Sequence, residues 1–344
     1  MRAVRFETFR GEPAIVEVPD PACPPRGALI TVHATGVCRS DWHAWQGHDD
    51  SVHLPHIPGH EFAGVVAEVG EEVRGFAVGD RVTAPFILAC GACEQCLAGV
   101  PQVCPRQRQP GFDQPGAWAE QVVVTEADHN LVALPDGIEM TLAAGLGCRV
   151  GTAHHAVRAQ AGVEPGEKVV VLGCGGLGLA CVMIALAAGA EVIAVDISET
   201  ALAAATALGA MPLVSGPDVA ERVRELTGGG AHVSLDALGS AATARAGIES
   251  LRPRGRHVQV GLLLGEDADP ALPIGRVIAL ELQIRGSHGL AVAEYAELLE
   301  DVASGRLDLA GTVGRVIDAE QLPAAMVAMD HPPTTAGMTV ARWV

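Results

Sequence analysis

Lysine is nearly absent from this chain of 344 residues, since Lys168 is the only lysine among 23 basic residues. Lys168 directly precedes an apolar run typical of a strand, so we do not expect a catalytic lysine. Positive charge is scarce overall, because 41 acidic residues give a formal charge of −18 at pH 7. This charge argues against binding to nucleic acid or to an anionic membrane surface. An anionic ligand would have to meet locally focused positive charge.

The sequence also lacks an apolar amino-terminal segment of the kind that directs export. We therefore expect a cytoplasmic protein whose nine cysteines are thiols or metal ligands rather than disulfides. Residues 169–190 carry no charge and are numerous enough to span a bilayer, but five glycines lie between Gly173 and Gly189. These glycines favour a buried strand followed by a helix over a membrane span.

The length suggests roughly two domains, and the apolar pattern divides the chain in that way. Residues 1–147 contain short alternating runs separated by turns, which predict an antiparallel, barrel-like β domain. Residues 148–284 alternate strands with helices, which predicts a doubly wound parallel α/β sheet. Residues 285–344 return to a mixed pattern with a helix near 292–304. The expected strands are 28–33, 64–69, 80–83, 120–124, 168–172, 191–195, 232–235 and 257–260, and the expected helices are 177–188, 199–207, 219–226 and 241–250.

Four cysteines follow one another at short intervals in the pattern Cys-x2-Cys-x2-Cys-x7-Cys. They are Cys90, Cys93, Cys96 and Cys104, and Gly91 allows the loop to fold back on itself. Four thiolates around one ion form the closed tetrahedral shell of a structural zinc site. The spacing therefore predicts a zinc ion that stabilises the loop without taking part in a reaction.

A glycine-rich motif follows the expected strand 168–172 and opens an apolar helix. Its glycines would allow a tight turn and a close approach of a pyrophosphate, to which the helix N-terminus adds positive potential. Asp196 ends the next strand, where a carboxylate would bind the 2′-hydroxyl of a ribose and repel a 2′-phosphate. The motif therefore predicts NAD(H) rather than NADP(H), with a turn used only for packing as the alternative. The glycines of the motif are Gly173, Gly175, Gly176 and Gly178.

Three further fragments are ambiguous when each is taken alone. They are residues 36–43 with Cys38, residues 58–61 with His60, and residues 147–152 with Cys148. A lone cysteine is usually a small buried hydrophobic residue, and His60 is one of five histidines between positions 43 and 60. Together with the four-cysteine loop and the glycine motif, however, the fragments form a specific combination.

With these motifs in this order, the chain resembles the zinc-dependent alcohol dehydrogenases of the medium-chain dehydrogenase/reductase superfamily. The resemblance covers essentially the whole chain. It implies a Rossmann domain at residues 148–284, inserted into a GroES-like β-barrel catalytic domain that is formed by residues 1–147 and 285–344.

The resemblance also implies a second, catalytic zinc ion held by Cys38, His60 and Cys148, with a fourth position open to the substrate. Asp41 would orient His60 from behind. Glu61 would lie close behind the zinc ion or serve as an alternate ligand. With the four-cysteine loop, the expected content is two zinc ions per subunit.

The same resemblance implies roles in proton transfer, cofactor binding and substrate binding. Ser40 and His43 would carry the proton of the alcohol to solvent through a ribose hydroxyl, a task suited to a histidine that titrates near neutrality. Phe86 and Trp45 would line the substrate pocket, with ordinary core packing as the open alternative for each. The remaining residues expected to contact NAD(H) are Arg39, Thr152, Leu177, Val260 and Leu262.

The chain departs from this family at one cofactor position. Many relatives carry Gly-Arg near the C-terminus, whereas the corresponding pair here is Gly337-Met338, with Arg342 nearby as an alternative. Without that arginine, binding of NAD(H) would depend more on Arg39 and on the helix N-terminus.

The expected reaction is reversible hydride transfer between NAD(H) and a primary or secondary alcohol, with an aldehyde or ketone as the product. A polyol or amino-alcohol dehydrogenase is the first alternative, although polyol relatives often use a carboxylate where this chain has Cys148. A non-catalytic protein that binds zinc and a nucleotide is the second. The expected partners are small molecules and further copies of the chain, as a homotetramer rather than a dimer. Cys23, Cys174 and Cys181 have no assigned role.

Overall fold

Runs of valine and other apolar residues form a six-stranded parallel sheet in the second half of the chain. The computed structural model describes residues 1–332 and 334–343. The strand order is β10-β9-β8-β11-β12-β13, so the order reverses between β8 and β11. Ligands of such sheets bind beyond the carboxyl ends of the strands at this reversal. The strands are Lys168–Leu172 (β8), Glu191–Asp196 (β9), Met211–Val214 (β10), Ala231–Asp236 (β11), Leu251–Gln259 (β12) and Gln283–Gly286 (β13).

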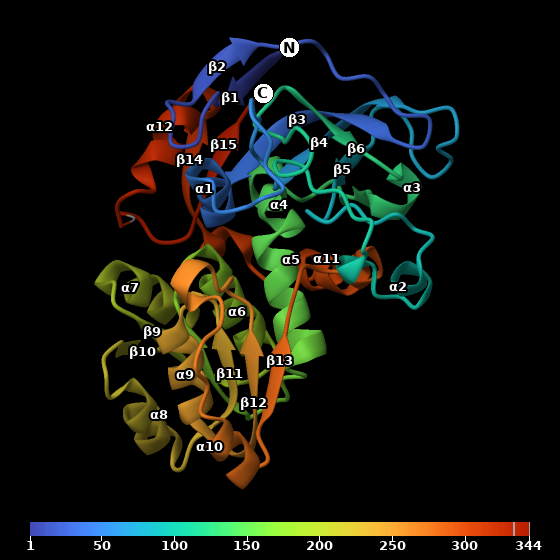
Figure 1. The fold of residues 1–344 in the computed structure, drawn as a ribbon. Helices are drawn as coiled ribbons and strands as arrows, with labels where there is room; N and C mark the ends of the chain where they lie inside the picture. Colours follow the sequence, from blue (N-terminus) through green and yellow to red (C-terminus); the bar gives the residue numbers. More distant parts are fainter. Residues whose placement is uncertain (333, 344) are drawn as a thin grey trace.

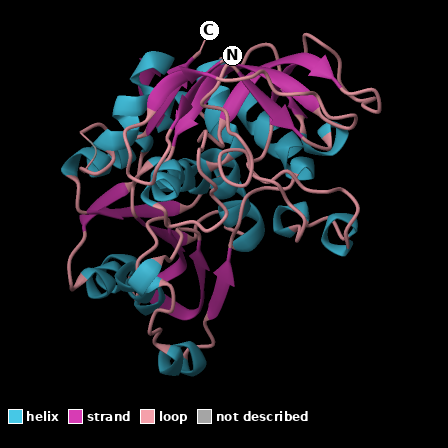
Figure 2. Cartoon of the chain, turned by 45° about the horizontal axis from the view of Figure 1, so that its top comes forward, coloured by secondary structure: helices cyan, strands magenta, loops and turns pink. Residues whose placement is uncertain are grey.

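The central strands β8, β9 and β11 are buried on both faces, as continuous apolar strands require. Val169 and Val171 pack into one apolar core and Val170 and Leu172 into another, because neighbouring side chains of a strand point to opposite faces. Helices cover the two faces (Figures 1 and 2). They are Gly176–Ala187 (α6), Glu199–Leu208 (α7), Val219–Thr227 (α8), Ala241–Glu249 (α9) and Ile274–Ala279 (α10).

The first part of the chain forms a separate β domain, which lies above the parallel sheet in Figure 1. Its main sheet has the order β14-β15-β3-β4-β5-β7, with β6 paired to β3, and β1 and β2 form a separate two-stranded sheet. The strands are Arg2–Arg5 (β1), Ala14–Glu17 (β2), Ala28–Val37 (β3), Phe62–Val69 (β4), Arg81–Thr83 (β5), Gln121–Val124 (β6), Val132–Ala133 (β7), Val313–Asp318 (β14) and Met338–Arg342 (β15). The last two strands come from the C-terminal segment, which therefore returns to the first domain.

Short helices connect the strands of the β domain and join the two domains. The helix α5 stands between the domains in Figure 1, packs against α6 and continues into the π-helical turn His155–Gln160. It thereby carries the residues at its N-terminus to the junction of the two domains. These helices are Arg39–Gln46 (α1), Glu94–Leu97 (α2), Ala127–Asn130 (α3), Met140–Ala143 (α4), Arg149–His154 (α5), Tyr295–Ala303 (α11) and Leu322–Ala328 (α12).

The fold agrees with the class expected from the sequence, a doubly wound parallel α/β sheet beside a mainly antiparallel β domain. The sequence pattern missed several short or irregular strands. The edge strand β10 contains Pro212, and β14 and β15 are recognisable only through their pairing in the sheet. The strand β13 ends at Gly286, two residues beyond the domain boundary expected at residue 284.

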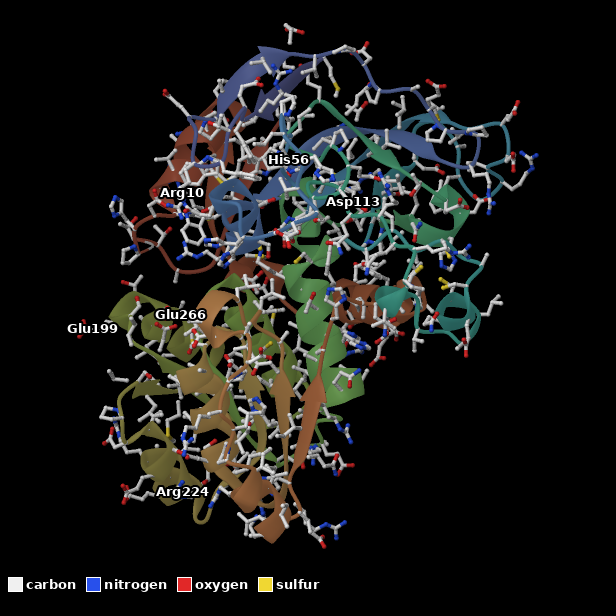
Figure 3. All side chains as sticks on the ribbon, viewed as in Figure 1. Arg10, His56, Asp113, Glu199, Arg224 and Glu266 are labelled. Atoms are coloured by element: carbon white, nitrogen blue, oxygen red, sulfur yellow. The ribbon has the colours of Figure 1, made fainter. Side chains whose placement is uncertain are left out.

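Side chains project outward from both domains (Figure 3). Glu199 at the start of α7 and Glu266 are exposed, for example, on the domain that contains the parallel sheet. Within residues 1–332 and 334–343, no helix combines the length and the apolar composition that a membrane crossing needs.

We expect Gly178→Ala to destabilise the parallel-sheet domain, because a Cβ at this position would collide with the carbonyl oxygen of Gly173. Gly175→Ala is the matched control, since a Cβ there has no neighbour within 4 Å among the described residues. Overpacking of this kind should lower the free energy of unfolding by about 1–3 kcal/mol. Urea denaturation of the two variants measures the difference, and an equal loss in both would contradict this account.

Candidate active site

Three distant segments of the chain bring four potential metal ligands together. Cys38 follows β3, His60 and Glu61 directly precede β4, and Cys148 precedes α5. One ligand atom from each of the four residues lies within 4.8 Å of the others. The expected ligands Cys38, His60 and Cys148 are therefore adjacent in the fold, at the place where α5 meets the β domain.

Asp41 fixes the orientation of His60. The Nδ1 atom of His60 donates to Oδ1 of Asp41 at 2.9 Å, and both residues are buried. Asp41 also accepts hydrogen bonds from the backbone nitrogens of Cys38 and Gly59, each at 3.0 Å. The Nε2 atom of His60 is buried and has no hydrogen-bond partner among the described residues, so it is left to bind a metal ion.

The two cysteines of this group suit zinc. A hydrogen bond shared with Cys148, together with His60 and the charge of Arg149, lowers the pKa of the Cys38 thiol well below its usual value. A thiolate is the form of cysteine that binds a metal. Two cysteines and one imidazole form the ligand set of a zinc site with an open position. The donor set thus fits the zinc ion that was expected from the resemblance.

The carboxylate of Glu61 is not free to bind a metal ion, because it forms a buried ion pair with Arg149. Its carboxylate accepts hydrogen bonds from the backbone nitrogen of Arg149 at 3.0 Å, from Nε at 2.9 Å, and from Nη2. Burial raises the pKa of Glu61, and the charge of Arg149 acts in the opposite direction. Sequence reasoning missed Arg149, although an arginine directly after a candidate ligand in an apolar segment is an available signal.

Aromatic side chains flank His60. The rings of Phe86 and Phe112 lie 6.1 Å and 5.3 Å from its imidazole ring, measured between centroids, and Phe86 also contacts His288. Phe86 thus lies beside the candidate ligands, and its place in a substrate pocket stays a prediction. Phe112 and His288 were missed because each is distant in sequence. Trp45 requires a correction: it is 4% exposed, donates to the carbonyl oxygen of Gly11 at 2.7 Å, and packs in the β-domain core rather than in a pocket.

Ser40 and His43 lie on α1, one turn from Cys38. The hydroxyl of Ser40 is 3.8 Å from the Cys38 sulfur, and Nδ1 of His43 is 3.0 Å from Nδ1 of His48. Burial, the neighbouring His48 and the charge of Arg39 lower the pKa of His43 to about 4. The expected histidine that titrates near neutrality is therefore corrected to one that is neutral at pH 7.

The glycine motif forms the turn between β8 and α6. Gly173 has a φ of +88°, a left-handed conformation that favours glycine, and its nitrogen donates to the carbonyl oxygen of Val195. Asp196 closes the turn from the next strand, because its carboxylate accepts from the nitrogens of Cys174 at 2.7 Å and Ser198 at 2.8 Å. The loop and the acidic residue thus meet at the edge of the sheet where a dinucleotide would bind.

The other residues expected to contact the cofactor range from buried to exposed. The hydroxyl of Thr152 is buried without a partner among the described residues, so it is available to a ligand. Leu177 is half-buried in the glycine loop, and Leu262 is 54% exposed just beyond β12, next to the buried Val260. Arg39 is exposed, stacks on the ring of Trp42 at 4.0 Å from its centroid, and donates to the carbonyl oxygen of Met329, so it turns toward the C-terminal segment rather than toward the glycine loop.

Met338 and Arg342 occupy different places. Met338 is fully buried, and its Cγ atom lies 2.8 Å from the point where a Cβ of Gly176 would stand. Arg342 instead lines a hollow of about 500 Å³ with His33, Arg81 and other residues that were not expected in the site. The residue facing the glycine loop is therefore Met338, in agreement with the expected departure from the family.

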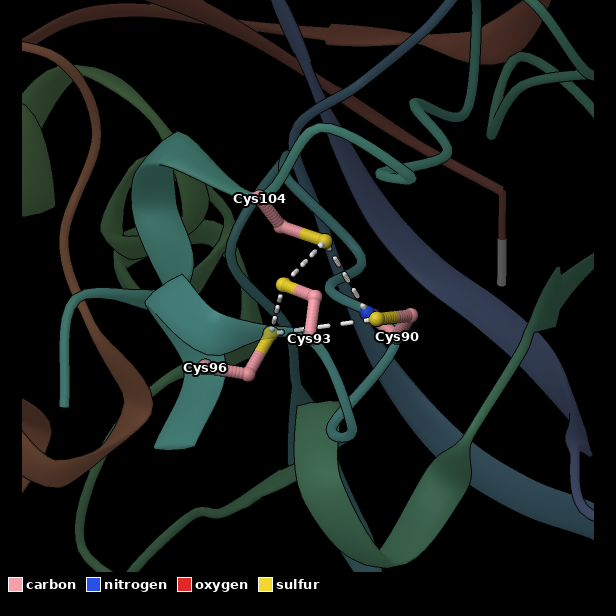
Figure 4. Close-up of side chains that lie close together, drawn as sticks. All are labelled: Cys90, Cys93, Cys96 and Cys104. Atoms are coloured by element: carbon pink, nitrogen blue, oxygen red, sulfur yellow. Dashed lines mark hydrogen bonds between the residues drawn. The ribbon is translucent and has the colours of Figure 1, made fainter. Parts of the chain in front are cut away.

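The four-cysteine loop contains α2 and brings its four cysteine side chains together (Figure 4). Its sulfurs lie within 4.8 Å of one another, with Cys93 3.4 Å from Cys96 and 3.6 Å from Cys104. A tetrahedral zinc ion with bonds of about 2.3 Å places sulfurs about 3.8 Å apart, whereas disulfide sulfurs lie about 2 Å apart. Hydrogen bonds from the Ala92 nitrogen and other groups lower the pKa of Cys90 to about 6. The loop is thus arranged for a metal ion.

A third group of potential ligands consists of His154, Glu297 and Asp301. Each carboxylate already pairs with an arginine, Glu297 with Arg158 at 2.7 Å and Asp301 with Arg306 at 2.6 Å. These guanidinium groups supply the positive charge that a cation would bring. The group is therefore an ion-pair network.

Two of the cysteines without an expected role are packing residues. Cys174 and Cys181 are fully buried, and burial raises the pKa of each thiol to about 12. Such buried thiols are poor nucleophiles at neutral pH, and neither belongs to a group of potential metal ligands among the described residues. Cys23 is half-buried beside the carbonyl oxygens of Pro24 and Gly27.

Comparison with known proteins identifies the family. Residues 24–136 match the alcohol dehydrogenase GroES-like domain, and residues 176–304 match the zinc-binding dehydrogenase domain. An alcohol dehydrogenase of Geobacillus stearothermophilus is 36% identical over 313 residues, which are 89% of this chain and 90% of the relative. The chain belongs to the zinc-type alcohol dehydrogenase family of medium-chain dehydrogenases/reductases.

The family contains enzymes with different substrates. A probable D-xylulose reductase A of Neosartorya fischeri is 37% identical, over 86% of this chain and 85% of the relative. Among solved structures, an alcohol dehydrogenase from Thermus sp. ATN1 superposes with a TM-score of 0.91 at 32% identity and covers 99% of both chains. The chain is therefore an oxidoreductase of this family, whose members act on different alcohols.

Metal removal should separate the two cysteine clusters. We expect Cys38→Ser to abolish alcohol oxidation and remove one zinc ion per subunit while the melting temperature changes little. Cys93→Ser should instead lower the melting temperature first, because a structural zinc site contributes to folding. Thermal melts beside zinc analysis and activity assays measure the contrast, and insoluble Cys38→Ser protein would indicate a structural metal at that position.

The pH dependence of His43 follows from its burial. A lowered pKa means that the neutral imidazole is favoured, so His43 should gain a proton only as the pH falls below about 5. NMR titration of ¹⁵N-labelled histidines measures this, with the His43 signal assigned by its loss in His43→Gln. A midpoint above pH 6 would contradict the expectation.

Proposed function

We propose that this alcohol dehydrogenase oxidises a primary or secondary alcohol with NAD and reduces the corresponding aldehyde or ketone with NADH, using one catalytic and one structural zinc ion per subunit. The observation that carries the proposal is the convergence of Cys38, His60 and Cys148 around a buried imidazole nitrogen without a partner among the described residues. The glycine loop on the neighbouring sheet supports a dinucleotide as the second component.

When bound, a zinc ion would supply a Lewis acid for the alcohol oxygen, and NAD(H) would accept or donate hydride. Asp41 holds the ring of His60 in place for this task. Phe86 and Phe112 present apolar surface beside that ring, which excludes water from the reacting atoms. The Ser40 hydroxyl, 3.8 Å from the Cys38 sulfur, would accept the alcohol proton as it gives up its own, and the neutral imidazole of His43 would take up a proton and release it to solvent.

The preference for NAD(H) over NADP(H) rests on Asp196. Its carboxylate already accepts two backbone hydrogen bonds at the glycine loop, and it keeps further lone pairs for ribose hydroxyls. A 2′-phosphate at the same place would meet a negative charge. In Asp196→Ala, the kcat/KM with NAD should therefore fall relative to the kcat/KM with NADP.

A polyol dehydrogenase is the second candidate function, favoured by the likeness to a probable D-xylulose reductase over most of the chain. A panel of ethanol, 2-propanol, benzyl alcohol, sorbitol and xylitol, each with NAD and with NADP, separates the candidates by kcat/KM. We expect the simple alcohols with NAD to give the highest values and a zinc chelator to abolish them. Absence of turnover with every alcohol would favour a non-catalytic protein.

Arg39→Ala should raise the Kd for NADH several-fold, because Arg39 lies at the start of α1, where the acidic chain otherwise offers little positive charge. Arg252→Ala is the control. Arg252 lies at the amino end of β12, whereas the cofactor is expected at the carboxyl ends of the parallel strands. Fluorescence titration with NADH measures both values. Equal Kd values for Arg39→Ala and the unmodified protein would contradict a role for Arg39.

The proposal includes a homotetramer in the cytoplasm. The nine cysteines are free thiols in the structure, as a reducing compartment would keep them. The tetramer rests on the chain length alone, by analogy with bacterial members of the family. Light scattering on the purified protein would report the mass of the assembly.

A further inference from the structure

Arg149 is a buried charge directly after the candidate ligand Cys148. It is 7% exposed, and its guanidinium group forms hydrogen bonds with Glu61 and with Val37, each next in sequence to a candidate metal ligand. Nε and Nη2 hold the two carboxylate oxygens of Glu61, and Nη1 donates to the carbonyl oxygen of Val37 at 3.2 Å. This fork-shaped pairing uses the planar geometry of arginine, which lysine cannot reproduce.

Glu61 is close enough to compete for the metal ion. A carboxylate oxygen of Glu61 lies within 4.8 Å of ligand atoms of Cys38, His60 and Cys148. A buried carboxylate without a partner is strongly unfavourable, so it would turn to the nearest cation. With Arg149 absent, that cation is the zinc ion, and Glu61 would close the position that the substrate needs.

Two glycines make room for this ion pair. A Cβ at Gly36 would collide with Oε2 of Glu61 and stand 2.8 Å from Nη2 of Arg149. A Cβ at Gly176 would stand 3.0 Å from Cδ and 3.2 Å from Nη1 of Arg149. Since Gly176 belongs to the glycine loop, Arg149 touches both the dinucleotide loop and the carboxylate beside the metal ligands. Met338 packs against the same glycine and brings no charge to it.

We propose that Arg149 is a positioning residue that holds Glu61 away from the zinc ion and supports the glycine loop. In this role it keeps the fourth position of the zinc ion open and packs its side chain against the glycine loop beside Met338. The proposal depends on the zinc-dependent function proposed above.

The test uses full-length protein in which Co²⁺ replaces Zn²⁺, so that imidazole binding at the open position changes the visible absorption. We expect Arg149→Met to shift the cobalt bands before imidazole is added and to weaken imidazole binding about tenfold or more, as an open fraction of about one tenth would produce. The double variant Glu61→Gln/Arg149→Met removes the competing carboxylate and should bind imidazole as the unmodified protein does.

NADH binding separates the two parts of the role. Fluorescence titration should show a raised Kd for NADH in Arg149→Met, and the double variant should keep that raised value, because Glu61→Gln does not restore the support of the glycine loop. Arg158→Met is the matched control, since Arg158 pairs with Glu297 at 2.7 Å outside the metal site. It should change neither the cobalt bands nor the Kd for NADH.

Unchanged cobalt bands and imidazole affinity in Arg149→Met would overturn the proposal. If that variant does not fold, Arg149→Gln decides, because it removes the charge that pairs with Glu61 and keeps a polar side chain in the buried site. A Kd for imidazole equal to that of the unmodified protein in Arg149→Gln would then overturn the proposal. Failure of the unmodified cobalt protein to respond to imidazole would overturn the catalytic zinc site as well, which distinguishes the two failures.

Discussion

The arrangement of the site depends on the buried carboxylate of Asp41. It accepts hydrogen bonds from the nitrogens of Cys38 and Gly59 and from the ring of His60, so that it joins the start of α1 to the segment before β4. Removing this acceptor would leave three donors unsatisfied in the interior, which is costly. The same hydrogen bonds aim the second ring nitrogen of His60 at the two cysteines. One carboxylate therefore determines both the local fold and the chemistry.

The link between the metal site and the cofactor runs through the N-terminus of α5. Cys148 supplies a ligand there, the next residue Arg149 pairs with Glu61 from the β domain, and the same arginine touches Gly176 in the glycine loop. Because the parallel sheet reverses its strand order between β8 and β11, the loop opens at this junction. Substrate and cofactor would thus meet where the two domains join.

Sequence reasoning succeeded where a function is encoded by neighbouring residues. The cysteines of residues 90–104 and the glycine loop are local sequence patterns. In the structure the four sulfurs lie together, and α6 begins within the glycine motif as predicted. Features that depend on packing between distant segments were missed, such as the contact of Phe112 with His60 and the pairing of Arg149 with Glu61. The burial of Trp45 in the β-domain core was missed for the same reason, because it depends on contacts between segments that are distant in sequence.

The central claim is that Cys38, His60 and Cys148 hold a zinc ion beside the dinucleotide loop. Anomalous diffraction at the zinc absorption edge, from crystals grown with NADH, tests it most directly. The account predicts one anomalous peak among these three side chains, with the Glu61 carboxylate turned toward Arg149, and a second peak in the four-cysteine loop. A single peak in the four-cysteine loop of fully active crystals would contradict it.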